Sequence, residues 1–241
     1  MKTFALSLLV LLAGCKKAPA DDAPVRVAAA SDLAEVFPVL ATRFEAGGGR
    51  HVEFTFGSSG LLARQLAEGA PFDVFASASP EFLDQAVTAG ACDGATSMPL
   101  VHGRLAVWPP GLTLETLVQG DGKIAIANPG HAPYGRAAKQ ALERAGLWAG
   151  LEKRVVLADN VRQAVQYVDS GNARGALVAV ANVVQRDAGA FTVIDASLHE
   201  PIEQRVVRCG RGARPDDAQR FLEFLKTPAA REVLLAAGFE P

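Results

Sequence analysis

Short apolar runs alternate with amphipathic stretches along most of this chain. The run at 25–30, VRVAAA, is typical of a buried strand, and Leu33, Phe37 and Phe44 then fall on one helical face. The same pattern predicts strands at 25–30, 51–56, 72–77, 103–109, 122–128, 153–158, 175–181, 191–195 and 203–210. It predicts helices at 32–46 (kinked at Pro38), 61–68, 80–90, 134–146, 161–170, 215–226 and 228–238. This alternation predicts an α/β fold, with mainly parallel sheets covered by helices on both faces.

The chain shows no internal repeat of solenoid period and no Gly/Ser linker that would divide it. Its 241 residues allow one large domain or two modest lobes. Two lobes without a linker would have to be joined by strands, which is a hinge architecture.

The N-terminus differs in character from the rest of the chain. Residues 1–14 combine one basic residue, Lys2, with an apolar run too short to span a bilayer, which predicts a signal peptide. The ending, LAGC, resembles a bacterial lipoprotein box, in which Cys15 would be lipidated and hold the protein at a membrane. Residues 15–24 would then form the lipidated cysteine and a polar, Pro-rich tether. The alternative is an ordinary secretory signal cut elsewhere.

Composition narrows the function classes. The chain is 49% hydrophobic and 21% charged with a formal net charge of −2, which is typical of a globular protein rather than a disordered or multi-pass membrane protein. With no basic excess and 7% aromatic residues, a nucleic-acid partner has little support. In an oxidising compartment Cys92 and Cys209 could form a disulfide or remain two buried thiols, and sequence leaves both open.

Four junctions between a predicted strand and a predicted helix carry candidate chemistry. They are Ala30–Ser31, FGSSG at 56–60, NPGHAPYG at 128–135 and ADNVRQA at 158–164. Each offers unpaired N–H groups at a helix start, and two add serine hydroxyls. Taken singly, each is an ordinary N-cap or turn. Taken together at the carboxyl ends of strands, they predict a site of neutral donors for a small oxyanion.

The segments AAASDL, FGSSGLLARQLAEGAPFDVFASA, NPGHAPYGRAAKQAL and ADNVRQAV resemble, in that order, the periplasmic molybdate-binding proteins of ABC transporters. The resemblance runs from about Val25 to Phe239. It implies a two-lobe type II periplasmic binding protein fold with the ligand in the interlobe cleft. Lobe 1 would comprise 25–103 plus 206–241, and lobe 2 would comprise 104–205.

The resemblance also implies a set of ligand-binding residues. Family hydroxyl donors match Ser31 and Ser59, with Ser58 beside the latter, and family main-chain amides match Tyr134 and Val161. Several family members use a tyrosine at the position of Ala179. Here the Tyr134 hydroxyl, Asn182 or a water would have to replace that phenol.

The resemblance further implies a periplasmic binding protein rather than an enzyme, which delivers molybdate or tungstate to an ABC permease in the inner membrane. The lipid on Cys15 would anchor this protein to a membrane, and a monomer is the simplest expectation for its oligomeric state. The protein would use no cofactor, and molybdenum would be bound only as the oxyanion. Three alternatives remain. One is a binding protein for sulfate, thiosulfate or phosphate, and another is a lipoprotein that has lost ligand binding. The third is a hydrolase with a triad of Ser59, His131 and Asp159.

Overall fold

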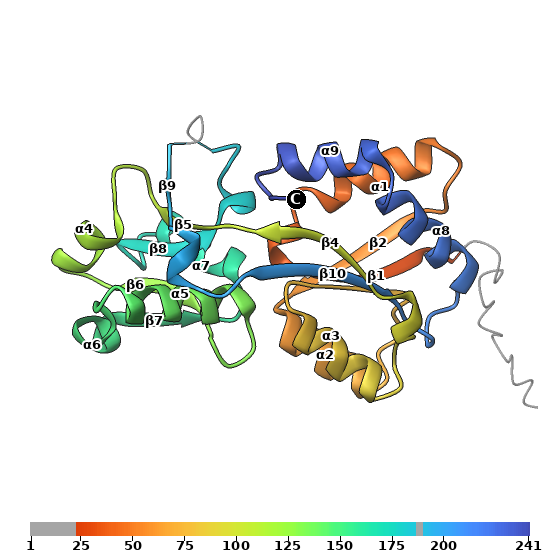
Figure 1. Cartoon of the computed structure of the whole chain (residues 1–241), viewed down its shortest axis with the longest axis horizontal. Coiled ribbons are helices and arrows are strands. Elements are labelled where there is room, and N and C mark those ends of the chain that lie inside the picture. Colours follow the sequence, from red (N-terminus) through yellow and green to blue (C-terminus); the bar gives the residue numbers. More distant parts are fainter. Residues whose placement is uncertain (1–22, 187–189) are drawn as a thin grey trace, which may run out of the picture.

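Two α/β lobes lie side by side along the long axis of the molecule (Figure 1). The computed structural model describes residues 23–186 and 190–241. Each lobe contains a five-stranded sheet, with strand order β2-β1-β3-β10-β4 in the first and β7-β6-β8-β5-β9 in the second. The predicted α/β class and two-lobe architecture are confirmed. The predicted signal peptide at 1–14, Cys15 and most of the tether lie outside the described residues.

The first sheet contains β1 (Val25–Ala30), β2 (Val52–Gly57), β3 (Val74–Ser77), β4 (Met98–Gly103) and β10 (Ile202–Arg208). The second contains β5 (Leu105–Trp108), β6 (Ile124–Ala127), β7 (Val155–Ala158), β8 (Gly175–Ala179) and β9 (Thr192–Val193). The helices include α1 (Phe37–Ala46), α2 (Ser59–Ala67), α3 (Pro80–Thr88), α4 (Leu114–Gln119), α5 (Pro133–Arg144), α6 (Trp148–Leu151), α7 (Val161–Asp169), α8 (Pro215–Leu225) and α9 (Pro228–Ala236). Short 3₁₀ turns include η1 (Ser31–Leu33) and η4 (Val180–Asn182).

Each sheet has a group of three parallel strands, and their register places the carboxyl ends of neighbouring strands side by side. Strands β2, β1 and β3 are parallel, as are β7, β6 and β8. In the first sheet Ala30 pairs with Gly57, and in the second Ala127 pairs with Ala158. The junctions that follow paired strands therefore begin at one edge of each sheet, which is where ligands bind in such sheets.

The chain passes between the lobes through extended segments. Strand β4 ends at Gly103 in the first sheet, and β5 begins at Leu105 in the second. The chain returns to the first lobe through β10, which pairs antiparallel with both β3 and β4. Figure 1 shows β4 and β10 extending from the first lobe toward the second. The division into 25–103 plus 206–241 and 104–205 stays a prediction, with its second boundary falling inside β10.

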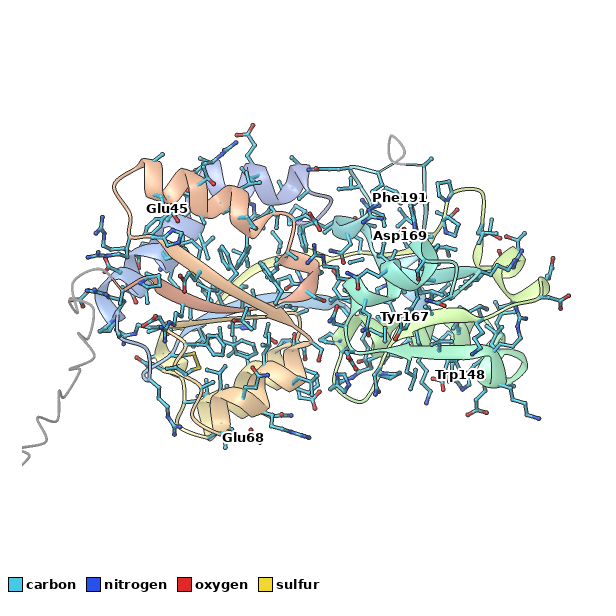
Figure 2. All side chains as sticks on the ribbon, turned by 180° about the vertical axis from the view of Figure 1, so that it is seen from behind. Glu45, Glu68, Trp148, Tyr167, Asp169 and Phe191 are labelled. Carbon is cyan, nitrogen blue, oxygen red and sulfur yellow. A yellow bond between two sulfur atoms is a disulfide. The ribbon has the colours of Figure 1, made fainter. Side chains whose placement is uncertain are left out.

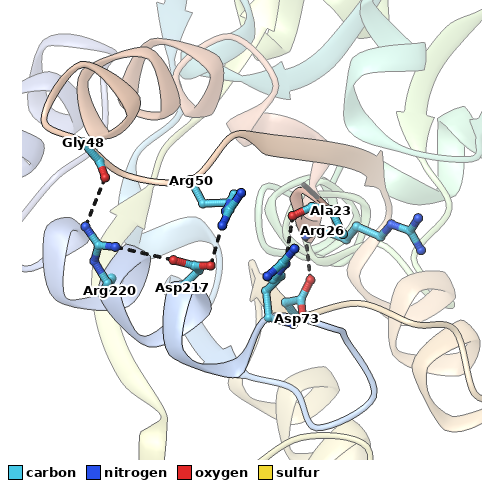
Figure 3. A network of polar contacts seen from close by, with 8 residues as sticks. Ala23, Arg26, Gly48, Arg50, Asp73, Asp217 and Arg220 are labelled. Atoms are coloured by element: carbon cyan, nitrogen blue, oxygen red, sulfur yellow. Dashed lines mark hydrogen bonds and ion pairs between the residues drawn. The ribbon is translucent and has the colours of Figure 1, made fainter. Parts of the chain in front are cut away.

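Aromatic contacts and buried hydrogen bonds between distant segments hold the first lobe together. On one face of its sheet, the ring of Phe221 in α8 packs edge-on against Phe44 and Phe37 of α1, with centroids 5.2 and 6.4 Å apart. Buried Asp73 accepts hydrogen bonds from the backbone N–H groups of Arg26 and Arg214, at 2.8 and 2.7 Å. Figure 3 shows Asp73 close to Ala23 and Arg26. These contacts fix the C-terminal helices on the N-terminal strands.

Two sequence-based predictions of local structure were wrong or incomplete. Pro38 does not kink a helix over 32–46, because α1 begins at Phe37 and Pro38 lies in its first turn. The first turn of a helix needs no N–H from that residue, so proline is accommodated there. The prediction also missed β4, α4 and the one-turn helix α6. Pro99 within β4 weakens its strand pattern, and α4 has only six residues.

A disulfide joins Cys92 and Cys209, which settles the alternative that sequence left open. It connects the segment after α3 to the end of β10, and is the yellow bond in the first lobe in Figure 2. The two cysteines are 117 residues apart, so only the folded chain brings them together.

Candidate anion-binding site

A small cavity lies where the two lobes meet. Its free volume is about 10 Å³, which is about the space that one water molecule needs. The lining residues are Ala30, Ser31, Asp32, Gly57, Ser58, Ser59 and Ala78 from one lobe, and Ala132, Pro133, Tyr134 and Val161 from the other. All four predicted junctions therefore contribute. The structure brings together Ser31, Ser58, Ser59, Tyr134 and Val161.

The first lobe supplies hydroxyl groups. Ser59 is fully buried, and its Oγ accepts a hydrogen bond from the Ala78 N–H at 3.0 Å. Because that bond uses the oxygen as an acceptor, the Ser59 O–H remains free to donate. Ser31 is 4% exposed and also lines the cavity. Two buried donors therefore line this side of the cavity.

The second lobe supplies main-chain N–H groups. Tyr134 is the second residue of α5, after Pro133, and Val161 is the first residue of α7. N–H groups in a first helical turn have no partner inside the helix. The Asn160 side chain caps α7 by accepting from the Gln163 N–H at 3.1 Å, which leaves the Val161 N–H for the cavity.

Gly135 allows α5 to begin where it does. A Cβ at this position would lie 2.0 Å from the carbonyl oxygen of Ala127, at the end of β6. Only glycine permits this approach, because any side chain would collide with the strand end. The glycine in PYG thus positions the Tyr134 N–H beside the cavity.

Asp32 is the one charged side chain among the described residues of the lining. It is 1% exposed, and its Oδ2 accepts a hydrogen bond from Gln204 Nε2 at 2.5 Å. Burial raises the pKa of Asp32 to about 7, against the smaller opposing effects of Tyr134 and Gln204. Since an ionised carboxylate would repel an anion, the cavity favours an anion most when Asp32 is protonated.

The Tyr134 side chain is directed to the first lobe. Its buried hydroxyl faces the Asp32 carboxyl without reaching full hydrogen-bond geometry. It also lies so close to Gly103 that a Cβ there would be 2.1 Å from it. Burial and the charge of Asp32 raise the pKa of Tyr134 well above its usual value. The phenol is therefore neutral and packs across the lobe boundary.

Further contacts across the boundary show that the lobes are closed. They are Arg136–Glu81 at 2.5 Å, Arg162–Glu35 at 3.5 Å, Asn182 Nδ2 to the Ser31 carbonyl oxygen at 3.3 Å, Ser58 Oγ–His131 Nδ1 at 2.8 Å, and the Gly60 N–H to the His131 carbonyl oxygen at 2.9 Å. Burial lowers the pKa of His131, although the nearby Asp159 opposes this effect. The lowered pKa favours the neutral form of the His131 imidazole.

Two expectations from the sequence do not match this geometry. Ala179 is fully buried in β8, paired with Leu105, and is not among the lining residues. The triad fails because His131 contacts Ser58, not Ser59, and does so through Nδ1. In a hydrolase triad Nδ1 would face the carboxylate instead.

From the sequence, His131 was a candidate only as a member of the triad, and the pairing of Asp32 with Gln204 was not predicted. Ser58 and His131 are 73 residues apart, and Asp32 and Gln204 are 172 apart. No local pattern marks such contacts. The one available signal was that His131 lies in a junction segment and Asp32 directly follows one.

Residues 25–240 match the family of bacterial extracellular solute-binding proteins. The chain belongs to this family. It is 31% identical over 229 residues to the molybdate-binding protein ModA of Rhodobacter capsulatus, covering 92% of this chain and 90% of that protein. It is 32% identical over 248 residues to ModA of Azotobacter vinelandii, covering 98% of each.

Among solved structures, this solute-binding protein is similar to the periplasmic molybdate-binding protein of Azotobacter vinelandii. The TM-score is 0.84 at 32% identity, over 90% of this chain and 99% of that one. This match confirms the type II periplasmic binding protein fold. None of the helices in the described part of the chain is long and apolar enough to cross a membrane.

Proposed function

We propose that this protein captures molybdate or tungstate outside the cytoplasm and delivers it to an ABC permease. The observation that carries the proposal is the convergence of hydroxyls from Ser31 and Ser59 with the N–H groups of Tyr134 and Val161 on one small cavity. The names of the relatives support it. Ser58 belongs to the same group of donors.

The chemistry of the donors matches a small dianion without a proton. Each helix start adds a partial positive charge, so the site offsets negative charge with dipoles instead of cations. Molybdate and tungstate carry two charges near neutral pH and need only donors. Sulfate has the same charge but is smaller, so donors spaced for longer metal–oxygen bonds would hold it through stretched, weak hydrogen bonds. Molybdenum would be held only as the oxyanion, through its oxygens.

The donor lost with Ala179 lowers the expected affinity without removing it. One hydrogen bond to a charged group is worth about 1.5–3 kcal/mol. Of the substitutes considered, the Tyr134 hydroxyl faces Asp32, and the Asn182 amide donates to the Ser31 carbonyl oxygen. A water is therefore the substitute we propose.

Hydrogenphosphate is a second candidate because of Asp32. A protonated anion needs an acceptor, and Asp32 Oδ1 is buried without a hydrogen-bond partner in the described residues. An ionised Asp32 could accept the proton of such an anion. This proposal would place Asp32 in direct contact with the ligand.

Capture would depend on closure, since the donors come from both lobes. Ligand binding would shift the population from open to closed lobes, and the closed form would dock on the permease. We propose export to the periplasm as a monomer, after removal of residues 1–14, with a lipid on Cys15 and a tether at 15–24.

Calorimetry tests the proposal. The chain from residue 23 onward contains both lobes and would be titrated with molybdate, tungstate, sulfate and phosphate. Submicromolar binding of the first two, with none of the others, is expected. Preferred binding of phosphate would support the second candidate, and binding of none of the four would refute both.

A further inference from the structure

His131 lies across the interlobe boundary from the start of α2. Its Nδ1 is 2.8 Å from Ser58 Oγ, and its carbonyl oxygen accepts from the Gly60 N–H at 2.9 Å. His131 precedes α5 in the second lobe and is not among the residues that line the cavity. It therefore holds a cavity residue without lining the cavity itself.

Gly60 makes this approach possible. A Cβ on Gly60 would lie 2.8 Å from the His131 carbonyl oxygen and 3.0 Å from its Cα. Both distances are shorter than ordinary contacts, so a side chain at this position would push the lobes apart. The two lobes are thus fitted to each other at this point.

Ser58 does not use its hydroxyl to cap α2, although it occupies the N-cap position. It is 4% exposed and lines the cavity. A hydroxyl has one proton to donate. If Ser58 donates it to His131, an oxygen lone pair faces the bound anion. If His131 Nδ1–H donates to Ser58, the Ser58 proton is free for the anion.

We propose that His131 is a positioning residue that donates from Nδ1 to Ser58 and so turns the Ser58 hydroxyl toward the ligand. The inference rests on the proposed function, because it concerns the same anion site. It links closure to donor geometry, since the two residues belong to different lobes. Anion binding then shifts the neutral imidazole toward the tautomer protonated at Nδ1.

The first test is a double-mutant cycle measured by calorimetry with molybdate, using the chain from residue 23 onward. His131→Leu keeps the main-chain bond to Gly60 but removes the bond to Ser58, and we expect the Kd to rise about tenfold. His131→Asn keeps a short N–H donor and should bind within about threefold of the wild type. Ser58→Ala combined with His131→Leu should bind no more weakly than Ser58→Ala alone, since both remove one interaction.

The matched control is His51→Leu. His51 is an exposed histidine whose Nδ1 pairs with Glu45 at 3.0 Å, at the opposite end of β2 from the cavity. We expect its Kd to equal that of the wild type. Additive losses in the cycle, or an unchanged Kd for His131→Leu, would overturn the positioning role.

The second test separates positioning from simple lobe contact. The ¹⁵N shifts of His131 report its tautomer at pH 7.5, and molybdate should move them toward the Nδ1–H form in the wild type but not in Ser58→Ala. Shifts that ignore the ligand would refute the inference. Gly60→Ala, checked for folding by circular dichroism, should weaken binding and leave the lobes more open in X-ray scattering.

Failure of the proposed function would look different. If the wild type binds molybdate and the His131 variants bind equally well, only the positioning role is wrong. If it binds sulfate instead, the proposed ligand is wrong, and the same cycle with sulfate still tests His131. If it binds neither dianion, both the ligand and the positioning role are refuted.

Discussion

Removing the Ser59 hydroxyl is the sharpest test of the site. Ser59 is fully buried, and its Oγ accepts the Ala78 N–H at 3.0 Å. Ser59→Ala therefore removes a proposed donor to the ligand and also leaves a buried backbone N–H without its partner. These two losses affect different measurements.

The expected loss in binding follows from the charge of the ligand. A hydrogen bond to a charged group contributes about 1.5–3 kcal/mol, so the Kd for molybdate should rise about tenfold to a hundredfold. The unpaired Ala78 N–H should lower the free energy of unfolding by about 1–3 kcal/mol. For a chain of this size, that corresponds to a fall of a few degrees in Tm.

Ser77→Ala is the matched control. Ser77 is also fully buried, and its Oγ donates to the Ser79 carbonyl oxygen at 2.7 Å and accepts from the Ser79 N–H at 3.1 Å. It does not line the cavity. Its loss should lower Tm by a similar amount and leave the Kd unchanged. An unchanged Kd for Ser59→Ala, or an equal loss of affinity in Ser77→Ala, would refute the reasoning.

Three further predictions concern Asp32, the disulfide and Gly135. Burial raises the pKa of Asp32 from 3.8 to about 7, so between these pH values the folded protein holds a proton that the unfolded chain releases. The free energy of unfolding should therefore fall, by up to about 1.4 kcal/mol per pH unit, as the pH rises through this range. Urea titrations at several pH values should show this slope in the wild type and a flatter one in Asp32→Asn. Replacing Cys92 and Cys209 by alanine should lower the free energy of unfolding by about 4 kcal/mol in the same assay, because the disulfide closes a long loop. A loss below about 1 kcal/mol would contradict this expectation. In Gly135→Ala the new Cβ would collide with the Ala127 carbonyl oxygen, so the variant should lose molybdate binding or fail to fold. Calorimetry would measure the binding and circular dichroism the folding. Wild-type affinity would contradict the placement of α5.

Local chemistry was sufficient to predict most elements and the individual donors. Strand and helix periods are properties of neighbouring residues, so β1 and α7 were found close to their observed bounds. The same holds for the serines at 58 and 59, because a hydroxyl at a helix start has a local signature. The resemblance to a known family then placed the donors in one site. The first helix was misjudged because Pro38 fits a helix start as well as a kink.

The sequence by itself determined which groups could bind an anion, because donor chemistry and helix starts are encoded within a few residues. Only the tertiary structure decided which of them meet. Ser58 faces His131 from 73 residues away, and Asp32 faces Gln204 from 172 residues away. These pairs depend on strand order and on lobe closure, which involve the whole chain. Burial of Asp32 beside Gln204, and hence its raised pKa, likewise exists only in the folded chain.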